Sequence, residues 1–77
     1  MIKLGRYKHY KGKEYQVLGE GIHTESEEVL VLYRPLYGDS VERDKIYIGP
    51  KEMFLERVLL KNKGVDRFEF VEEVEVE

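Results

Sequence analysis

Apolar and polar residues alternate with a period of two along most of this chain. Such alternation is typical of strands that bury one face and expose the other. It covers residues 6–10, 14–18, 45–48, 56–60 and 67–71, and short segments rich in glycine or charge separate these stretches. Long helical periodicity is missing from the sequence, so we expect an all-β domain.

Glycines and apolar runs refine this pattern. Gly19 and Gly21 flank Glu20, a spacing that predicts a β-bulge or sharp bend in a strand. Residues 25–28 are polar and predict the tip of a hairpin, and the apolar run 29–33 predicts a strand buried on both faces. Residues 41–45 are mostly charged, and we expect them to form a mobile loop.

The second half of the chain contains the one candidate for helical structure. Pro50 suits a first helical position, so residues 50–55 predict a single short 3₁₀ turn. Lys61-Asn62-Lys63-Gly64 predicts a turn between two strands. Closely spaced strands in a chain of 77 residues therefore predict a small five- or six-stranded SH3-like barrel with one short 3₁₀ turn.

The length allows one domain, which we place at residues 1–71. Residues 72–77 alternate glutamate with valine and predict either an acidic C-terminal edge strand or a frayed tail. An edge strand can pair with its copy in a second chain. We therefore expect a monomer or a weak dimer formed through this strand.

Charge is unevenly distributed, although the formal net charge is only −3. Residues 1–13 contain five cations and no acid, whereas residues 66–77 contain six acids and one cation. One interpretation is that the two ends lie side by side in one sheet and neutralise each other. The other is a basic binding face with an acidic tail that competes for it.

Composition limits the chemistry. The sequence has no cysteine, so a disulfide, a thiolate metal site and a cysteine nucleophile are all excluded. A small domain without disulfides favours a reducing, cytoplasmic setting, and no stretch has the length or apolarity of a signal peptide or membrane span.

His9, His23 and Glu25 could meet at a metal, but two histidines without close spacing favour hydrogen bonding to the backbone instead. With two histidines and two loop serines, we expect neither catalysis nor a cofactor.

Tyrosine is the most informative residue type. A chain of this size buries only about 60% of its unfolded surface, so its core cannot enclose all six tyrosines. We expect several at the rim of the barrel, where they could grip a proline-rich peptide, stack on bases or surround a methylated ammonium group. The leading hypothesis is a non-catalytic module that binds a peptide or protein partner. Its candidate site residues are His9, His23, Tyr33, Arg34 and Tyr37.

Each residue of this candidate site has an expected role. Tyr33 and Tyr37 would supply stacking surface, and Arg34 would anchor an anion through two parallel hydrogen bonds. His9 and His23 would supply hydrogen bonds that respond to pH near neutrality. The alternative hypothesis is nucleic-acid binding through the basic first hairpin, for which the candidate residues are Lys3, Arg6, Lys8, Lys11 and Lys13. The overall acidic balance counts against this alternative.

Several motifs resemble a bacterial family called domain of unknown function 1653. They are Gly5-Arg6-Tyr7-Lys8-His9-Tyr10-Lys11-Gly12, Glu14-Tyr15-Gln16-Val17-Leu18-Gly19, His23, Val31-Leu32-Tyr33-Arg34-Pro35-Leu36-Tyr37-Gly38-Asp39 and Pro50-Lys51-Glu52-Met53-Phe54-Leu55-Glu56. The resemblance implies a stand-alone domain with an SH3-like barrel and no known activity. This chain departs from the family pattern at Ile48-Gly49, where the family usually has an apolar residue and arginine before the proline. It also has His23-Thr24-Glu25-Ser26 where the family often has His-Ser-Glu-Thr.

Overall fold

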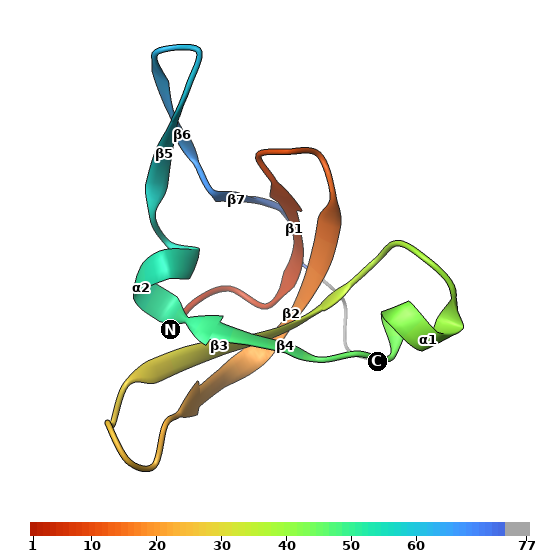
Figure 1. Ribbon diagram of the computed structural model, residues 1–77, viewed down its shortest axis with the longest axis vertical. Coiled ribbons are helices and arrows are strands. Elements are labelled where there is room, and N and C mark those ends of the chain that lie inside the picture. Colours follow the sequence, from red (N-terminus) through yellow and green to blue (C-terminus); the bar gives the residue numbers. More distant parts are fainter. Residues whose placement is uncertain (74–77) are drawn as a thin grey trace.

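The computed structural model of the protein describes residues 1–73, which form strands and two short helical turns (Figure 1). The strands are β1 (Gly5–His9), β2 (Glu14–Ile22), β3 (Val29–Pro35), β4 (Tyr47–Pro50), β5 (Arg57–Leu60), β6 (Lys63–Asp66) and β7 (Phe68–Glu72). The helical turns are α1 (Ser40–Arg43) and α2 (Lys51–Phe54). The predicted all-β class is confirmed. Each helical turn within residues 1–73 is four residues long, too short to cross a bilayer.

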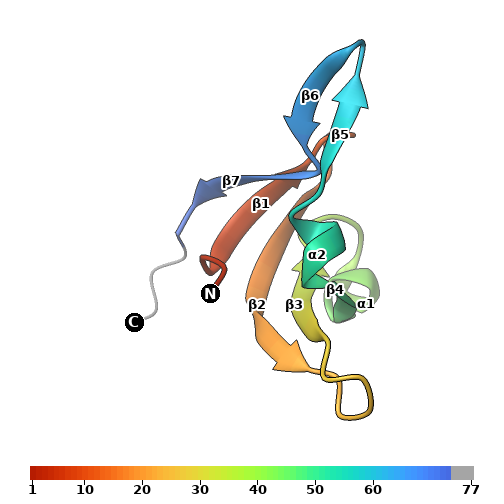
Figure 2. The same cartoon turned by 90° about the vertical axis from the view of Figure 1, so that its left-hand side faces the viewer.

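Five strands form one antiparallel sheet in the order β4-β3-β2-β1-β7, and β5 and β6 form a separate hairpin. The hairpin projects away from the body of the molecule in both views (Figures 1 and 2). Within the described residues β4 and β7 remain the edges of the larger sheet, so the strands do not close into the predicted barrel. Phe54 of α2 packs against Tyr33 of β3 and Phe68 of β7.

Strand β2 contains the predicted irregularity. Its pairing with β3 shifts register between Val17 and Gly19, which identifies a β-bulge next to the first of the two glycines. Gly21 lies two residues further along, and a Cβ atom there would come 3.3 Å from Cδ1 of Leu32. The bulge changes the direction of the second half of β2.

The core is small and lies on the concave face of the sheet. Its buried members are Ile2, Tyr7, Val17, Val31 and Phe54, and Tyr33, Phe68 and Phe70 pack against them. The strand members occupy alternate positions, as the period of two predicts. The Tyr7 hydroxyl donates to the carbonyl oxygen of Lys3 at 2.7 Å, so the phenol is buried without losing a hydrogen bond.

The two ends of the described chain pair directly. Strand β1 lies between β2 and β7, and Lys8 is opposite Glu69 in the ladder. Arg6 forms ion pairs with Glu14 and with Glu72, each at 2.8 Å. The interpretation that basic and acidic ends neutralise each other in one sheet is therefore confirmed. Of the predicted acidic tail, residues 74–77 lie outside the described residues, and dimerisation through β7 stays a prediction.

Three local predictions need correction. Residues 41–45 are not a mobile loop, because α1 covers most of them and Asp39 caps it by accepting the N–H of Glu42 at 2.9 Å. The expected 3₁₀ turn at 50–55 is the α-helical turn α2. The turn expected at 61–64 is shorter, because Lys61 and Asn62 both have positive φ, as in a two-residue type I′ turn. Gly64 therefore belongs to β6.

Candidate ligand-binding pocket

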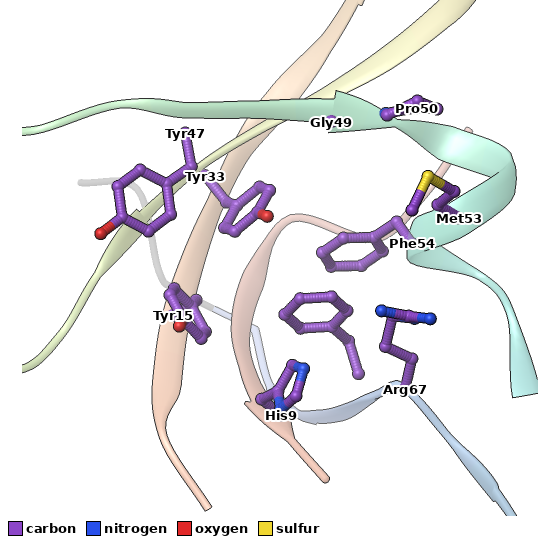
Figure 3. A pocket seen from close by; sticks show the side chains of 10 residues that line it. His9, Tyr15, Tyr33, Tyr47, Gly49, Pro50, Met53, Phe54 and Arg67 are labelled. Atoms are coloured by element: carbon purple, nitrogen blue, oxygen red, sulfur yellow. The ribbon is translucent and has the colours of Figure 1, made fainter. Parts of the chain in front are cut away.

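A pocket of about 240 Å³ opens on the concave side of the sheet, beside α2 (Figure 3). Aromatic rings supply most of its wall, together with one histidine and one arginine. Its lining residues are His9, Tyr15, Tyr33, Tyr47, Gly49, Pro50, Met53, Phe54, Arg67 and Phe68. Every one of these residues comes from a strand, from α2 or from the β6–β7 junction, so the pocket is built on the ordered framework.

Strand alternation brings the tyrosines together. Tyr33 and Tyr47 are direct partners in the β3–β4 ladder, and their ring centroids lie 5.7 Å apart. Tyr15, on β2, meets Tyr33 edge to face at 5.4 Å. Gly49 has no side chain, so this part of the wall stays open. A Cβ atom at that position would lie 3.9 Å from the Tyr33 hydroxyl oxygen, in ordinary van der Waals contact. Edge-to-face packing of this kind holds the rings in fixed orientations.

Two phenylalanines form the opposite part of the wall. Phe54 and Phe68 stack with centroids 4.2 Å apart and an angle of 6° between their planes. Phe54 is 4% exposed and also meets Tyr7 edge to face, so the stack is anchored in the core. The pocket and the core therefore share side chains.

Arg67 is the charged residue of the pocket wall. Its backbone N–H donates to the carbonyl of Glu56, and its own carbonyl accepts from the N–H of Tyr10, both at 3.0 Å. One terminal nitrogen, Nη2, donates to Glu56 Oε1 at 2.9 Å. Nε is enclosed and has no hydrogen-bond partner within residues 1–73, a situation that costs about 1–3 kcal/mol.

His9 lies beside Arg67 because His9 pairs with Phe68 in the β1–β7 ladder. Burial lowers the pKa of His9, and the charges of Arg67 and Lys11 lower it further, so the ring is neutral at pH 7. Its Nδ1 accepts the backbone N–H of Lys11 at 3.1 Å. The proton of the neutral ring is therefore on Nε2.

The tyrosine hydroxyls stay protonated. Burial raises the pKa of Tyr15, and a hydrogen bond with Tyr37, at 3.1 Å between the hydroxyl oxygens, raises it further. Burial also raises the pKa of Tyr33. The Tyr47 hydroxyl donates to Glu42 Oε1 at 2.7 Å, and this contact with a carboxylate raises the pKa of Tyr47. The pocket therefore has neutral phenols and one permanent positive charge.

Comparison with known proteins places the chain in a family. Residues 5–70 match the family described as "Protein of unknown function (DUF1653)". The chain belongs to the DUF1653 family. A DUF1653 protein from Bordetella bronchiseptica, known from a crystal structure, is 30% identical, with a TM-score of 0.82 over 99% of this chain and 95% of the other. No curated protein matches the chain.

The structure brings together part of the site predicted from the sequence of this DUF1653 protein. His9 and Tyr33 line the pocket, and Tyr37 lies one side chain away, hydrogen-bonded to Tyr15. Arg34 lies on the other face of the sheet, because neighbouring residues of a strand point in opposite directions. It is exposed and donates to the Gln16 side chain at 3.3 Å.

His23 is also remote from the pocket. It lies at the β2–β3 hairpin, where its Nδ1 accepts the backbone N–H groups of Glu25 and Ser26 at 3.2 and 3.3 Å. This geometry is the histidine-to-backbone hydrogen bonding expected in place of a metal site. Within residues 1–73, no group of three or more metal-ligating side chains comes together.

The residues of the DUF1653 pocket that the sequence did not single out come from distant segments. Tyr15, Tyr47 and Phe68 lie in predicted strands and Phe54 in the predicted helical turn, but the sequence gives no reason to group them. Arg67 stood out only as the single cation among six acids. That isolation was the one available signal, since a lone cation kept in an acidic segment suggests a specific role.

The basic hairpin residues proposed for nucleic acid are largely engaged within the fold. Arg6 forms ion pairs with Glu14 and Glu72. Its hydrogen bonds to these two carboxylates raise the pKa of the guanidinium group. The ammonium groups of three lysines lie over aromatic rings: Lys3 over Phe70, Lys11 over Tyr10 and Lys13 over Tyr37, at 5.0, 5.9 and 4.5 Å from the centroids. Lys8 faces Glu69 across the ladder.

Proposed function

We propose that this DUF1653 protein is a non-catalytic binding module that recognises a peptide segment of a protein partner in its aromatic pocket. The observation that supports the proposal best is the convergence of five aromatic rings on one open cavity: Tyr15, Tyr33, Tyr47, Phe54 and Phe68. Rings held by the core lose little entropy when a ligand binds, so they suit recognition.

The size of the pocket supports a peptide. Sites for whole small molecules are usually about 300–1,000 Å³, whereas this pocket measures about 240 Å³. Such a volume suits one or two side chains that extend from a longer segment bound along the surface. Aromatic-lined grooves also favour proline-rich segments, whose extended conformation exists before binding.

The residues of the pocket support binding rather than catalysis. Its ten lining residues include no serine, threonine, cysteine or carboxylate that could serve as a nucleophile or a paired base. The three phenols have raised pKa values and are poor proton acceptors at neutral pH. Only neutral His9 could exchange a proton there, and the wall contains no serine, threonine, cysteine or carboxylate with which it could act.

Peptide selection followed by nuclear magnetic resonance titration would test this function. A peptide isolated by phage display on the folded domain should shift the amide signals of Tyr33, Phe54 and Phe68 first. Tyr33→Leu should weaken binding at least tenfold, because it removes one ring of the pocket. The matched control is Phe70→Leu, which removes a core ring that does not line the pocket, and it should bind normally once folding is verified.

Two results would contradict the proposal. Signals that shift only outside the pocket would show that its rings are structural. Affinity that falls steeply with salt, together with competition by an oligonucleotide, would favour nucleic acid instead, because phosphate contacts release counterions.

A further inference from the structure

The pocket has two chemically different sides. Figure 3 shows His9 and Arg67 together on one side and Tyr47, Gly49 and Pro50 on the other. The tyrosine side offers ring faces and edges, whereas the His9–Arg67 side offers hydrogen-bond donors. None of the ten lining residues is acidic. A ligand that fits both sides needs an apolar part and a hydrogen-bond acceptor.

Arg67 can bind such an acceptor without leaving its place. A guanidinium group has five N–H donors, and Glu56 uses only Nη2 within the described residues. Glu56 does not line the pocket, and its side chain is 48% exposed, so solvent screens its charge. The Arg67 side chain is less exposed, at 29%, and its remaining terminal donors are available for an anion.

His9 adds a second donor to the same side. Because Nδ1 already accepts the N–H of Lys11, the neutral ring donates through Nε2. The ring is fixed between Tyr10, at 4.6 Å, and Phe68, at 5.0 Å. A fixed donor beside a guanidinium group is a suitable arrangement for the two oxygens of a carboxylate.

The same features disfavour the other ligands that aromatic residues can hold. A methylated ammonium group would be repelled by Arg67 and would meet no carboxylate in the wall. A nucleotide carries an anion and a flat base, but a pocket of about 240 Å³ is small for its base, sugar and phosphate together.

We propose that the pocket recognises a peptide carboxylate that lies next to a proline or another compact apolar side chain. Arg67 binds the carboxylate, His9 contributes a second hydrogen bond, and the tyrosine side holds the apolar group. This inference rests on the proposed function and specifies its ligand.

Two small probes test the inference. N-acetyl-L-proline carries a carboxylate, and its primary amide is neutral, so the two probes have nearly the same shape but differ in charge and in one acceptor oxygen, which the amide replaces by an NH₂ donor. Titration of the domain, followed by amide signals of His9, Phe54 and Phe68, should show roughly tenfold tighter binding of the carboxylate, in line with a charge-assisted hydrogen bond. Arg67→Gln should remove this difference and leave the weaker binding of the amide.

Variants of neighbouring charges serve as controls. Arg57→Gln makes the same charge change outside the pocket, at a residue paired with Asp66, and should leave both affinities unchanged. Glu56→Gln frees Arg67 and should tighten carboxylate binding several-fold. Arg67→Lys keeps the charge and loses the planar fork, so it should retain part of the preference even if Arg67→Gln fails to fold.

The outcomes separate the two proposals. Equal affinity for the two probes, with shifts in the pocket, would overturn the carboxylate preference and leave the binding module intact. No shift in the pocket from either probe would overturn both. Binding of adenosine monophosphate or tetramethylammonium in the pocket, in preference to N-acetyl-L-proline, would overturn the inference in favour of that ligand class.

Discussion

Phe54 connects the core to the pocket, so its removal tests the framework on which both proposals depend. The side chain is 4% exposed, stacks on Phe68 at 4.2 Å and meets Tyr7 and Tyr33 at 5.3 and 5.6 Å between centroids. Phe54→Ala removes all three aromatic contacts. It also leaves a void between α2 and the sheet.

The expected cost is large for a domain of this size. Phenylalanine-to-alanine changes in a core cost about 3–5 kcal/mol, which includes the void. A domain of 77 residues has about 4–12 kcal/mol of total stability at 0.05–0.15 kcal/mol per residue. Phe54→Ala should therefore remove between about a quarter and all of the free energy of unfolding. Phe54→Leu keeps most of the volume and should cost about 1–2 kcal/mol.

Urea unfolding followed by circular dichroism measures this effect. With a urea dependence of about 1 kcal/mol per molar for a small domain, the Phe54→Ala midpoint should fall by about 3–5 M or the variant should be unfolded without urea. Met53→Ala is the matched control, because Met53 lies next to Phe54 in α2 but is 50% exposed. A Phe54→Ala stability within about 0.5 kcal/mol of the wild type would refute the claim that α2 completes the core.

Three further predictions test other features. The pKa of His9 is lowered in the fold, so below the unfolded value of about 6.5 the unfolded state takes up the proton first. Stability should be full above that pH and fall as the pH drops towards the folded pKa, a loss that His9→Gln should reduce. Gly5→Ala should destabilise the fold by at least about 1–3 kcal/mol, because Gly5 has φ of 141° and a Cβ atom would lie 2.3 Å from the carbonyl oxygen of Glu72. Gly19→Ala should be tolerated in the same urea assay, because a Cβ atom at that position would have no neighbouring atom within 4 Å. Tyr47→Phe should cost about 1 kcal/mol by removing the hydrogen bond to Glu42, and the same change in a Glu42→Gln background should cost less.

The strands could be predicted from the sequence, because the alternation that produces them involves residues that are close together in the chain. The period of two predicted strands over residues 6–10 and 14–18, in which Tyr7 and Val17 are buried, and the glycine pair around Glu20 marked the bulge in β2. A turn was predicted at residues 61–64, but its two-residue form was not, because Lys61 and Asn62 both adopt positive φ although neither is glycine. The capped turn α1 escaped for a related reason, as a charged segment looked like a loop.

The candidate site was less predictable because it depends on tertiary contacts. Alternation itself separates Tyr33 from Arg34, yet two rings and a guanidinium so close in sequence suggested one shared surface. The guanidinium that lines the pocket belongs to Arg67, which pairing between β1 and β7 brings beside His9. The charge pattern indicated that the two ends of the chain lie side by side, but it did not identify His9 and Arg67 as neighbours in a pocket.

Pairing between the first and last described strands has a consequence for biosynthesis. The ion pair between Arg6 and Glu72 joins residues 66 positions apart, and β1 gains its second neighbour only when β7 is present. During translation a ribosome must release the segment through Glu72 before this ladder can form. Folding of the domain is thus a late event, which follows synthesis of nearly all of residues 1–73, and chaperones would meet an open, aromatic-rich sheet until then.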